Sequence, residues 1–160
     1  MATTQTLATF LPYQNEPPAA SYATLDMRNG QPVLDFDGSA DEEAIFSGIM
    51  PSNYAGGGIT VILHVAFTSA TTGTANIECS VERGSTDMDA DSFDTMTDAS
   101  ATPNGTSGIE TKVTIALANN DSIVAGDHFR LKVRRDADGT NGTDDITTDM
   151  ELRSIELRET

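Results

Sequence analysis

Alternating apolar and polar residues run through most of the chain after position 22, and they predict β-strands. In the segment 59–67 every second residue is large and apolar, which turns one face of the strand toward a core. The same alternation occurs in 75–82, 109–117, 129–134 and 150–158. We expect 59–67 to pair with 75–82, and 129–134 to pair with 150–158, with the polar face of 75–82 in solvent.

Turn signals separate these segments at short intervals. Asn29-Gly30 lies between two apolar stretches and predicts a tight hairpin, and a third stretch, 44–50, ends at Pro51. Turns recur about every ten residues, and a helical pattern is weak throughout. The fold class indicated is all-β, an antiparallel β-sandwich of about seven or eight strands.

The last strand contains a break in its pattern. Its apolar phase slips between Leu152 and Ile155. One extra residue in a strand restores the phase, so we expect a β-bulge at Arg153-Ser154.

Residues 1–21 differ from the remainder, because they hold three prolines and no periodicity. Proline lacks the backbone donor that a central strand needs, so we expect an extended N-terminal arm over 1–21 and one sandwich domain over 22–160. Apolar side chains such as Leu7 and Phe10 would anchor the arm, on its own domain or on a partner.

The charge of the chain disfavours some classes of binding partner. The 160 residues carry a formal net charge of −16, which disfavours nucleic acid and anionic membranes as partners. Six of the nine basic residues lie after position 128, and they either pair with acidic residues across the sheet or contact a neighbouring subunit head to tail. No signal peptide and no membrane span is expected, and Cys79, the single cysteine, is expected to be buried.

Candidate chemistry is sparse. Asp87, Asp89 and Asp91 resemble the start of a calcium loop but lack its later glycine and glutamate, so a solvated acidic loop is favoured. The segment from Asp136 to Asp145 has many oxygen ligands, and a hairpin loop is its default interpretation. His64 and His128 have no partners that indicate zinc or a nucleophile. We therefore expect a non-enzymatic protein with no catalytic, cofactor or metal residues.

A sugar site is the main alternative for this fold class. Saccharide rings commonly stack on aromatic faces, but the chain has no Trp and only Tyr13, Tyr22 and Tyr54. Tyr54, in a Gly-rich loop, is the candidate to contribute.

Three internal segments and the chain end resemble small structural proteins of tailed bacteriophages. They are Pro51-Ser-Asn-Tyr-Ala-Gly-Gly-Gly-Ile-Thr-Val, Asp89-Ala-Asp-Ser-Phe-Asp, Ala125-Gly-Asp-His-Phe-Arg-Leu-Lys-Val-Arg-Arg-Asp-Ala and Asp149 to Thr160. The resemblance covers roughly 45–160.

This resemblance implies a jelly-roll virion protein, a capsid decoration (cement) protein that oligomerises as a trimer and binds the major capsid protein. It would lie on the capsid exterior after synthesis in the host cytoplasm. The alternative is a phage tail or fibre module that binds a host-surface glycan.

Overall fold

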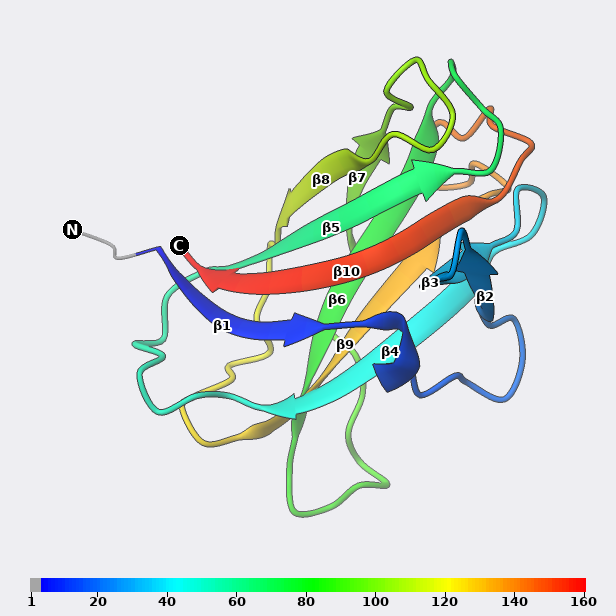
Figure 1. Ribbon diagram of the computed structural model, residues 1–160. Helices are drawn as coiled ribbons and strands as arrows, with labels where there is room; N and C mark the ends of the chain where they lie inside the picture. The colour runs from blue at the N-terminus through cyan, green and yellow to red at the C-terminus, as the bar shows by residue number, and fades with distance from the viewer. Residues whose placement is uncertain (1–3) are drawn as a thin grey trace.

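The computed structural model describes residues 4–160 as two antiparallel β-sheets packed face to face (Figure 1). One short 3-10 helix, η1, spans Pro12–Gln14. The strands of this part of the chain are β1 Gln5–Phe10, β2 Thr24–Arg28, β3 Gln31–Phe36, β4 Glu42–Ile49, β5 Ile59–Phe67, β6 Ala75–Gly84, β7 Thr97–Ala101, β8 Thr111–Ala116, β9 His128–Arg135 and β10 Met150–Glu159. The predicted antiparallel β-sandwich is thereby confirmed.

The two sheets are built from interleaved parts of the chain. Sheet A has the strand order β2-β3-β10-β5-β8, and β1 also pairs with β10. Sheet B has the order β4-β9-β6-β7. No helix within residues 4–160 has the length and apolar character needed to cross a membrane.

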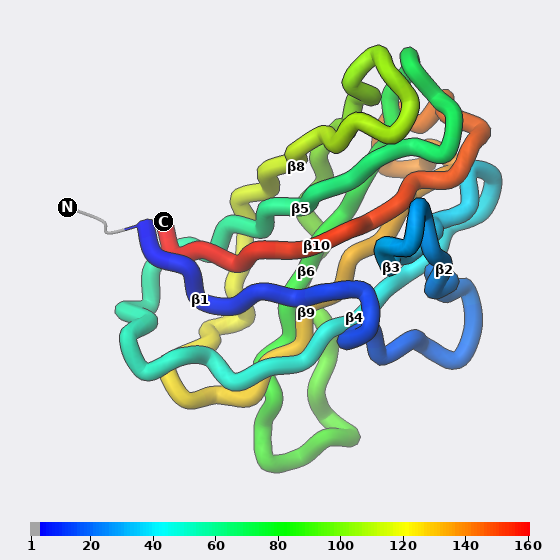
Figure 2. Tube along the Cα trace, viewed as in Figure 1, coloured from blue at the N-terminus to red at the C-terminus, as the bar shows by residue number. Residues whose placement is uncertain are grey.

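Both predicted strand pairs are wrong. β5 and β6 lie in different sheets, and so do β9 and β10 (Figure 2). β5 pairs with β10 and β8, whereas β6 pairs with β7 and β9. Alternation fixes which face of a strand is buried, but every strand offers the same backbone donors and acceptors, so it does not fix the partner.

The apolar faces of both sheets meet in one core. Phe10, Phe46 and Phe129 are at most 3% exposed and pack together, with ring centroids 5.4 Å apart for Phe10 and Phe46 and 6.3 Å for Phe10 and Phe129. Cys79 is buried as predicted, and desolvation raises the pKa of its thiol above the ordinary value. Such a thiol is an inert core side chain.

The polar face of β6 is not in solvent, which corrects the sequence-based prediction. Its four side chains are at most 4% exposed, namely Asn76, Glu78, Ser80 and Glu82. Long basic side chains of β9 cover part of this face. The ring of Phe93 lies against two of them, with its centroid 5.0 Å from Arg130 Cζ and 4.5 Å from Lys132 Nζ. The alternation within β6 does not predict this burial, because the covering side chains belong to another strand and to a loop.

Basic residues of β9 pair with acidic residues across the sheet. Arg130 contacts Glu82 at 2.7 Å, and Arg134 contacts Glu78 at 2.6 Å. Lys132 lies 3.4 Å from Glu43 of β4 on the other side. Of the two roles considered for the late basic residues, pairing within the sheet is therefore the one that these residues fill.

The N-terminal segment folds back on its own domain. β1 pairs with the second half of β10, and Leu7 and Phe10 enter the core. After η1, the backbone N–H of Glu16 donates to the carbonyl of Ile45 at 2.7 Å. Within the described residues, the expected arm of 1–21 is thus part of the sandwich and extends sheet A; its first three residues lie outside the described residues.

The predicted hairpin is confirmed, and one strand lies where none is predicted. Asn29 and Gly30 both have positive φ, 48° and 75°, and join β2 to β3 in the predicted hairpin. By contrast, β7 lies in a stretch for which the alternation predicts no strand. The strand β7 has small and polar residues only, Thr-Asp-Ala-Ser-Ala, so it carries no strong apolar alternation.

Candidate functional site

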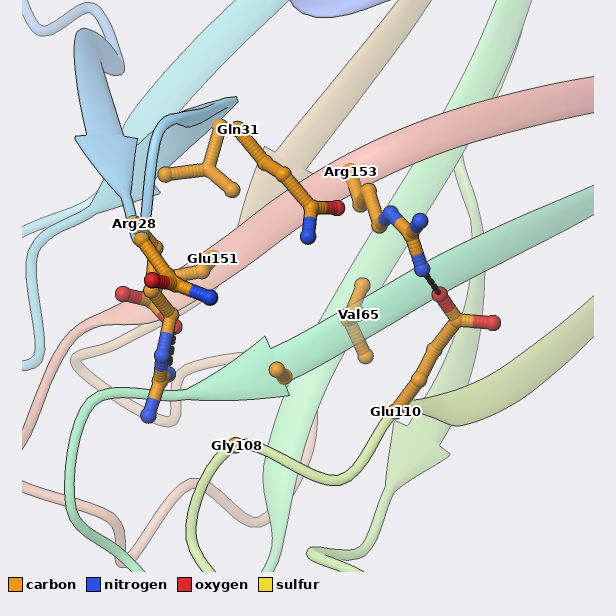
Figure 3. Close-up of a pocket in the computed structure, with 10 residues that line it drawn as sticks. Arg28, Gln31, Val65, Gly108, Glu110, Glu151 and Arg153 are labelled. Atoms are coloured by element: carbon orange, nitrogen blue, oxygen red, sulfur yellow. Dashed lines mark hydrogen bonds and ion pairs between the residues drawn. The ribbon is translucent and has the colours of Figure 1, made fainter.

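A pocket of about 230 Å³ lies on the outer face of sheet A (Figure 3). Its walls come from the β2–β3 hairpin, from β10 and from the segment before β8. The residues that line it include Arg28, Asn29, Gln31, Val33, Ala66, Gly108, Glu110, Glu151 and Arg153. These residues come from four regions that are far apart in sequence.

The predicted bulge in β10 is confirmed, and it aims one side chain at this pocket. The pairing of β10 with β5 shifts register between Leu152 and Ser154. The extra residue, Arg153, leaves the ladder, and its side chain is 58% exposed at the pocket rim. Bulges re-aim side chains in this way because the extra residue has no partner on the next strand.

Arg28 forms the opposite wall. Its Nη1 donates to the carbonyl oxygen of Phe67 at 3.0 Å and to the carboxylate of Glu151. Its Nη2 lies 3.3 Å from the hydroxyl of Ser107, which ties the hairpin to the loop before β8. Gly108 has a φ of +82°, and a Cβ there would lie 3.0 Å from Arg28 Nη2, so the glycine permits this approach.

Glu110 holds Arg153 in place. Arg153 Nη1 donates to Glu110 Oε2 at 3.2 Å, and His64 Nδ1 lies 2.5 Å from Glu110 Oε1 (Figure 3 shows the first contact). Burial favours a higher pKa for Glu110, but hydrogen bonds and charge from His64 and Arg153 outweigh it and lower the pKa. The carboxylate therefore stays ionised and keeps both partners oriented.

The pocket combines planar polar groups with an apolar floor. Val33 of β3 is buried on the outer face, apart from the main core cluster, and Ala66 of β5 lines the pocket on the other side of β10. Two guanidinium groups and the amides of Asn29 and Gln31 surround this floor. Each arginine is paired with one carboxylate, so the site carries little net charge. Planar guanidinium and amide groups can form paired hydrogen bonds with adjacent hydroxyls of one ligand.

An acidic group lies next to the pocket. Asp35 of β3 stands opposite Glu151 of β10. Desolvation, with added repulsion from Glu151, Asp26 and Asp149, raises the pKa of Asp35 to about 7. A carboxyl group titrating near neutral pH makes this edge of the site sensitive to pH.

The structure does not bring the two histidines together. His64 is on β5 of sheet A, beside the pocket, whereas His128 begins β9 of sheet B. His64 touches Glu110 rather than a nucleophile. The two side chains share neither a metal site nor a catalytic arrangement in the described residues.

The two acidic segments differ. In the first, Asp87 accepts from the backbone N–H of Asp89, and Asp91 accepts from that of Ser85, so these carboxylates serve the local loop. In the second, Asp136 and Asp138 come together with Asp41, which the sequence did not place near them.

Tyr54 does not line the pocket. It is 5% exposed, its hydroxyl donates to the carbonyl of Gly57 at 2.6 Å, and it accepts from Asn120 at 3.0 Å. The ring is part of the core cluster, so it offers no stacking face, which corrects the role considered for it.

Sequence reasoning missed the pocket itself. Its only signals were the hairpin turn at Asn29-Gly30, with Arg28 and Gln31 on either side, and the phase slip at Arg153. Neither signal states that these segments meet, because β3 and β10 are joined only by the tertiary pairing.

The sequence matches no family model, and no curated protein matches it. Solved structures do resemble the fold. A xylan-binding module, CBM15, superposes with a TM-score of 0.54 at 9% identity, covering 100% of this chain and 98% of that one. The CBM22-1 xylan-binding domain from Paenibacillus barcinonensis gives 0.53 at 12% identity, covering 99% and 97%.

A larger protein contains a similar domain. An exo-β-1,3-galactanase from Phanerochaete chrysosporium gives a TM-score of 0.58 at 13% identity over 96% of this chain. This chain spans only 29% of that enzyme. At these identities the likeness establishes the fold alone, a jelly-roll-like β-sandwich, and confirms the predicted architecture.

Proposed function

We propose that this protein is a non-enzymatic glycan-binding module and that the pocket between the β2–β3 hairpin and Glu110 holds the saccharide. The observation that carries the proposal is the ring of planar polar groups, Arg28, Gln31 and Arg153 among them, around an apolar floor. A sugar ring has an apolar face and a polar edge, and this arrangement matches both.

The charge of the site favours a neutral sugar. Arg28 and Arg153 are each paired with a carboxylate, so neither offers a free positive charge to an acidic sugar. The net charge of −16 repels anionic polymers at long range. The cavity of about 230 Å³ is below the roughly 300–1,000 Å³ of pockets for drug-sized ligands, so one ring of a chain would enter.

The structural neighbours support the same class of ligand. Two of them are described as xylan-binding, and each aligns over nearly its whole length with this chain. Among the functions considered from sequence, the glycan-binding alternative therefore gains more support than the capsid role.

Binding to a panel of neutral oligosaccharides, beginning with xylan and β-1,3-galactan fragments, tests the proposal by array and calorimetry. Arg153→Ala should weaken binding of the best ligand roughly tenfold or more, since a hydrogen bond from a charged donor is worth about 1.5–3 kcal/mol. Ser100→Ala, an exposed change on β7 of the other sheet, is the matched control. The proposed function is contradicted if the protein binds no saccharide, or if Arg153→Ala and Ser100→Ala bind the best ligand with equal affinity.

A second function has its own observation. Five exposed apolar side chains gather around η1 and β2, namely Leu11, Tyr13, Tyr22, Leu25 and Met27, each at least 44% exposed. Tyr13 and Tyr22 also line a shallow groove beside them. Exposed apolar groups of this kind mark protein contacts. We infer, as second candidate, that this patch binds a phage major capsid protein or a sister subunit in a trimer.

Mixing the protein with decoration-free capsids, together with light scattering of the free protein, tests the second function. Leu25→Ser combined with Tyr13→Ser should abolish sedimentation with capsids or dissociate the trimer. A wild-type protein that stays monomeric and does not bind capsids contradicts the idea, whatever its affinity for sugars.

A further inference from the structure

Three carboxyl groups converge at one end of the sandwich. Asp41 precedes β4, and Asp136 and Asp138 follow β9. Each offers an oxygen atom within 4.8 Å of the other two. In Figure 1 the β3–β4 and β9–β10 connections lie side by side at this end. The backbone N–H of Asp138 donates to Asp41 Oδ1 at 3.2 Å, which links the two loops directly.

Asp136 is a buried carboxylate with one oxygen unpaired. It is fully buried, and its Oδ2 accepts from Asn76 Nδ2 at 3.1 Å and from the backbone N–H of Asn141 at 2.9 Å. Its Oδ1 has no hydrogen-bond partner among the described residues. A buried carboxylate oxygen without a partner costs free energy, so an additional ligand at this position would be stabilising.

The unpaired oxygen of Asp136 lies near a second carboxylate oxygen. Arg134 Nη2 lies 3.9 Å from Asp136 Oδ1 and also 3.9 Å from Asp41 Oδ2, so both oxygens adjoin the same guanidinium nitrogen. At that distance the guanidinium does not hydrogen-bond to either oxygen. Its Nε is already committed to Glu78 at 2.6 Å. Arg134 compensates the negative charge only in part.

We propose that Asp41, Asp136 and Asp138 bind a calcium ion that joins the β3–β4 loop to the β9–β10 loop. Calcium takes hard oxygen ligands, accepts carboxylates in flexible geometry and completes its shell with water or backbone oxygens. Magnesium demands a more regular octahedron and keeps its waters, so the site favours calcium. The proposal departs from the sequence-based expectation that no residue binds metal, and the three aspartates lie apart from the residues that line the proposed saccharide pocket.

Calorimetric titration of calcium into the full chain, previously treated with a chelator, tests the proposal. We expect one saturable site with a Kd on the order of 10⁻⁴–10⁻³ M, as in extracellular modules, and a melting temperature that rises with calcium. Asp138→Asn should weaken binding at least tenfold. Asn keeps an oxygen that can accept from Thr140, and the position is exposed, so the fold is preserved.

Asp89→Asn is the matched control, because it removes one negative charge from an exposed acidic loop outside the cluster. It should bind calcium like the wild type. The proposal is overturned if no saturable binding occurs up to about 10 mM, well above this affinity range. It is equally overturned if Asp138→Asn binds as well as the wild type, or if magnesium reproduces the calcium response in both, since charge screening alone would then explain it.

Discussion

Arg135→Met is expected to lower the free energy of unfolding by about 3–5 kcal/mol, the largest effect of any single polar substitution considered. Arg135 ends β9 with a fully buried side chain, and the side chain of its partner Asp144 is 1% exposed. Two parallel contacts of 2.9 Å join the pair, from Nε to Oδ2 and from Nη2 to Oδ1. Removing the guanidinium would leave the Asp144 carboxylate buried without its counter-charge.

Arg135 also organises the crossover between the two sheets. It donates to the carbonyl oxygen of Thr148 at 2.8 Å, to that of Phe36 at 3.3 Å, and to that of Ile146. These acceptors lie in β3 and in the loop that carries the chain from β9 to β10. Because one side chain satisfies several buried oxygens, its loss should loosen this loop as well as the pair.

Urea unfolding monitored by circular dichroism measures the effect, and the melting temperature should fall by roughly 6–20 °C. Arg158→Met is the matched control, since Arg158 is 41% exposed and pairs with Glu156 on its own strand. Arg158→Met should lower the free energy of unfolding by less than about 1 kcal/mol. Combining Arg135→Met with Asp144→Leu should recover part of the loss. If Arg135→Met and Arg158→Met lower the free energy of unfolding equally, the buried Arg135–Asp144 pair does not have the stabilising role assigned to it.

Asp35→Asn is expected to stabilise the protein at pH 8 by about 1–2 kcal/mol, after discounting for solvent screening at this partly exposed site. Asp35 has a pKa of about 7 in the folded protein against an ordinary value of 3.8. Burial is the main cause, and repulsion from Glu151, Asp26 and Asp149 adds to it. An amide has the same shape and carries no charge.

The direction of the pH dependence follows from the raised pKa. The folded state holds the Asp35 proton more tightly than the unfolded chain, so protonation contributes stability that is complete below about pH 4. That contribution is lost as the pH rises through 7. Wild-type stability should therefore decline between pH 5 and pH 8, whereas Asp35→Asn should flatten this part of the curve.

Denaturant midpoints for both proteins at pH 5 and at pH 8 measure the difference. Glu42 also has a raised pKa from burial, so a small residual slope in the variant is expected. If the two proteins lose the same stability between these pH values, Asp35 is not the group responsible.

Several features of the molecule were accessible from sequence because they depend on neighbours along the chain. The hairpin at Asn29-Gly30 follows from residues that tolerate positive φ. The bulge at Arg153 follows from a slip in alternation, and the burial of Cys79 follows from its phase in the strand. Each of these is a property of a few consecutive residues.

Other features depend on contacts between distant segments, and sequence reasoning did not find them. The polar face of β6 is buried because β9 and Phe93 cover it. Local spacing predicts an ordinary turn at Asp136, because no neighbouring residue indicates that Asp41, about a hundred residues earlier, lies beside it. The pocket proposed to bind a saccharide requires the β2–β3 hairpin, β10 and Gly108 to meet.

The sequence alone determined that this chain forms strands, where they turn and which face of most strands is buried, because a strand's side chains alternate with a period of two whatever it pairs with. Only the tertiary structure decided which strands are neighbours. Backbone hydrogen bonding is nearly the same for any pair of edges, so the packing of two whole sheets selects the partners. The pocket, the buried Arg135–Asp144 pair and the cluster of three aspartates all arise from that selection.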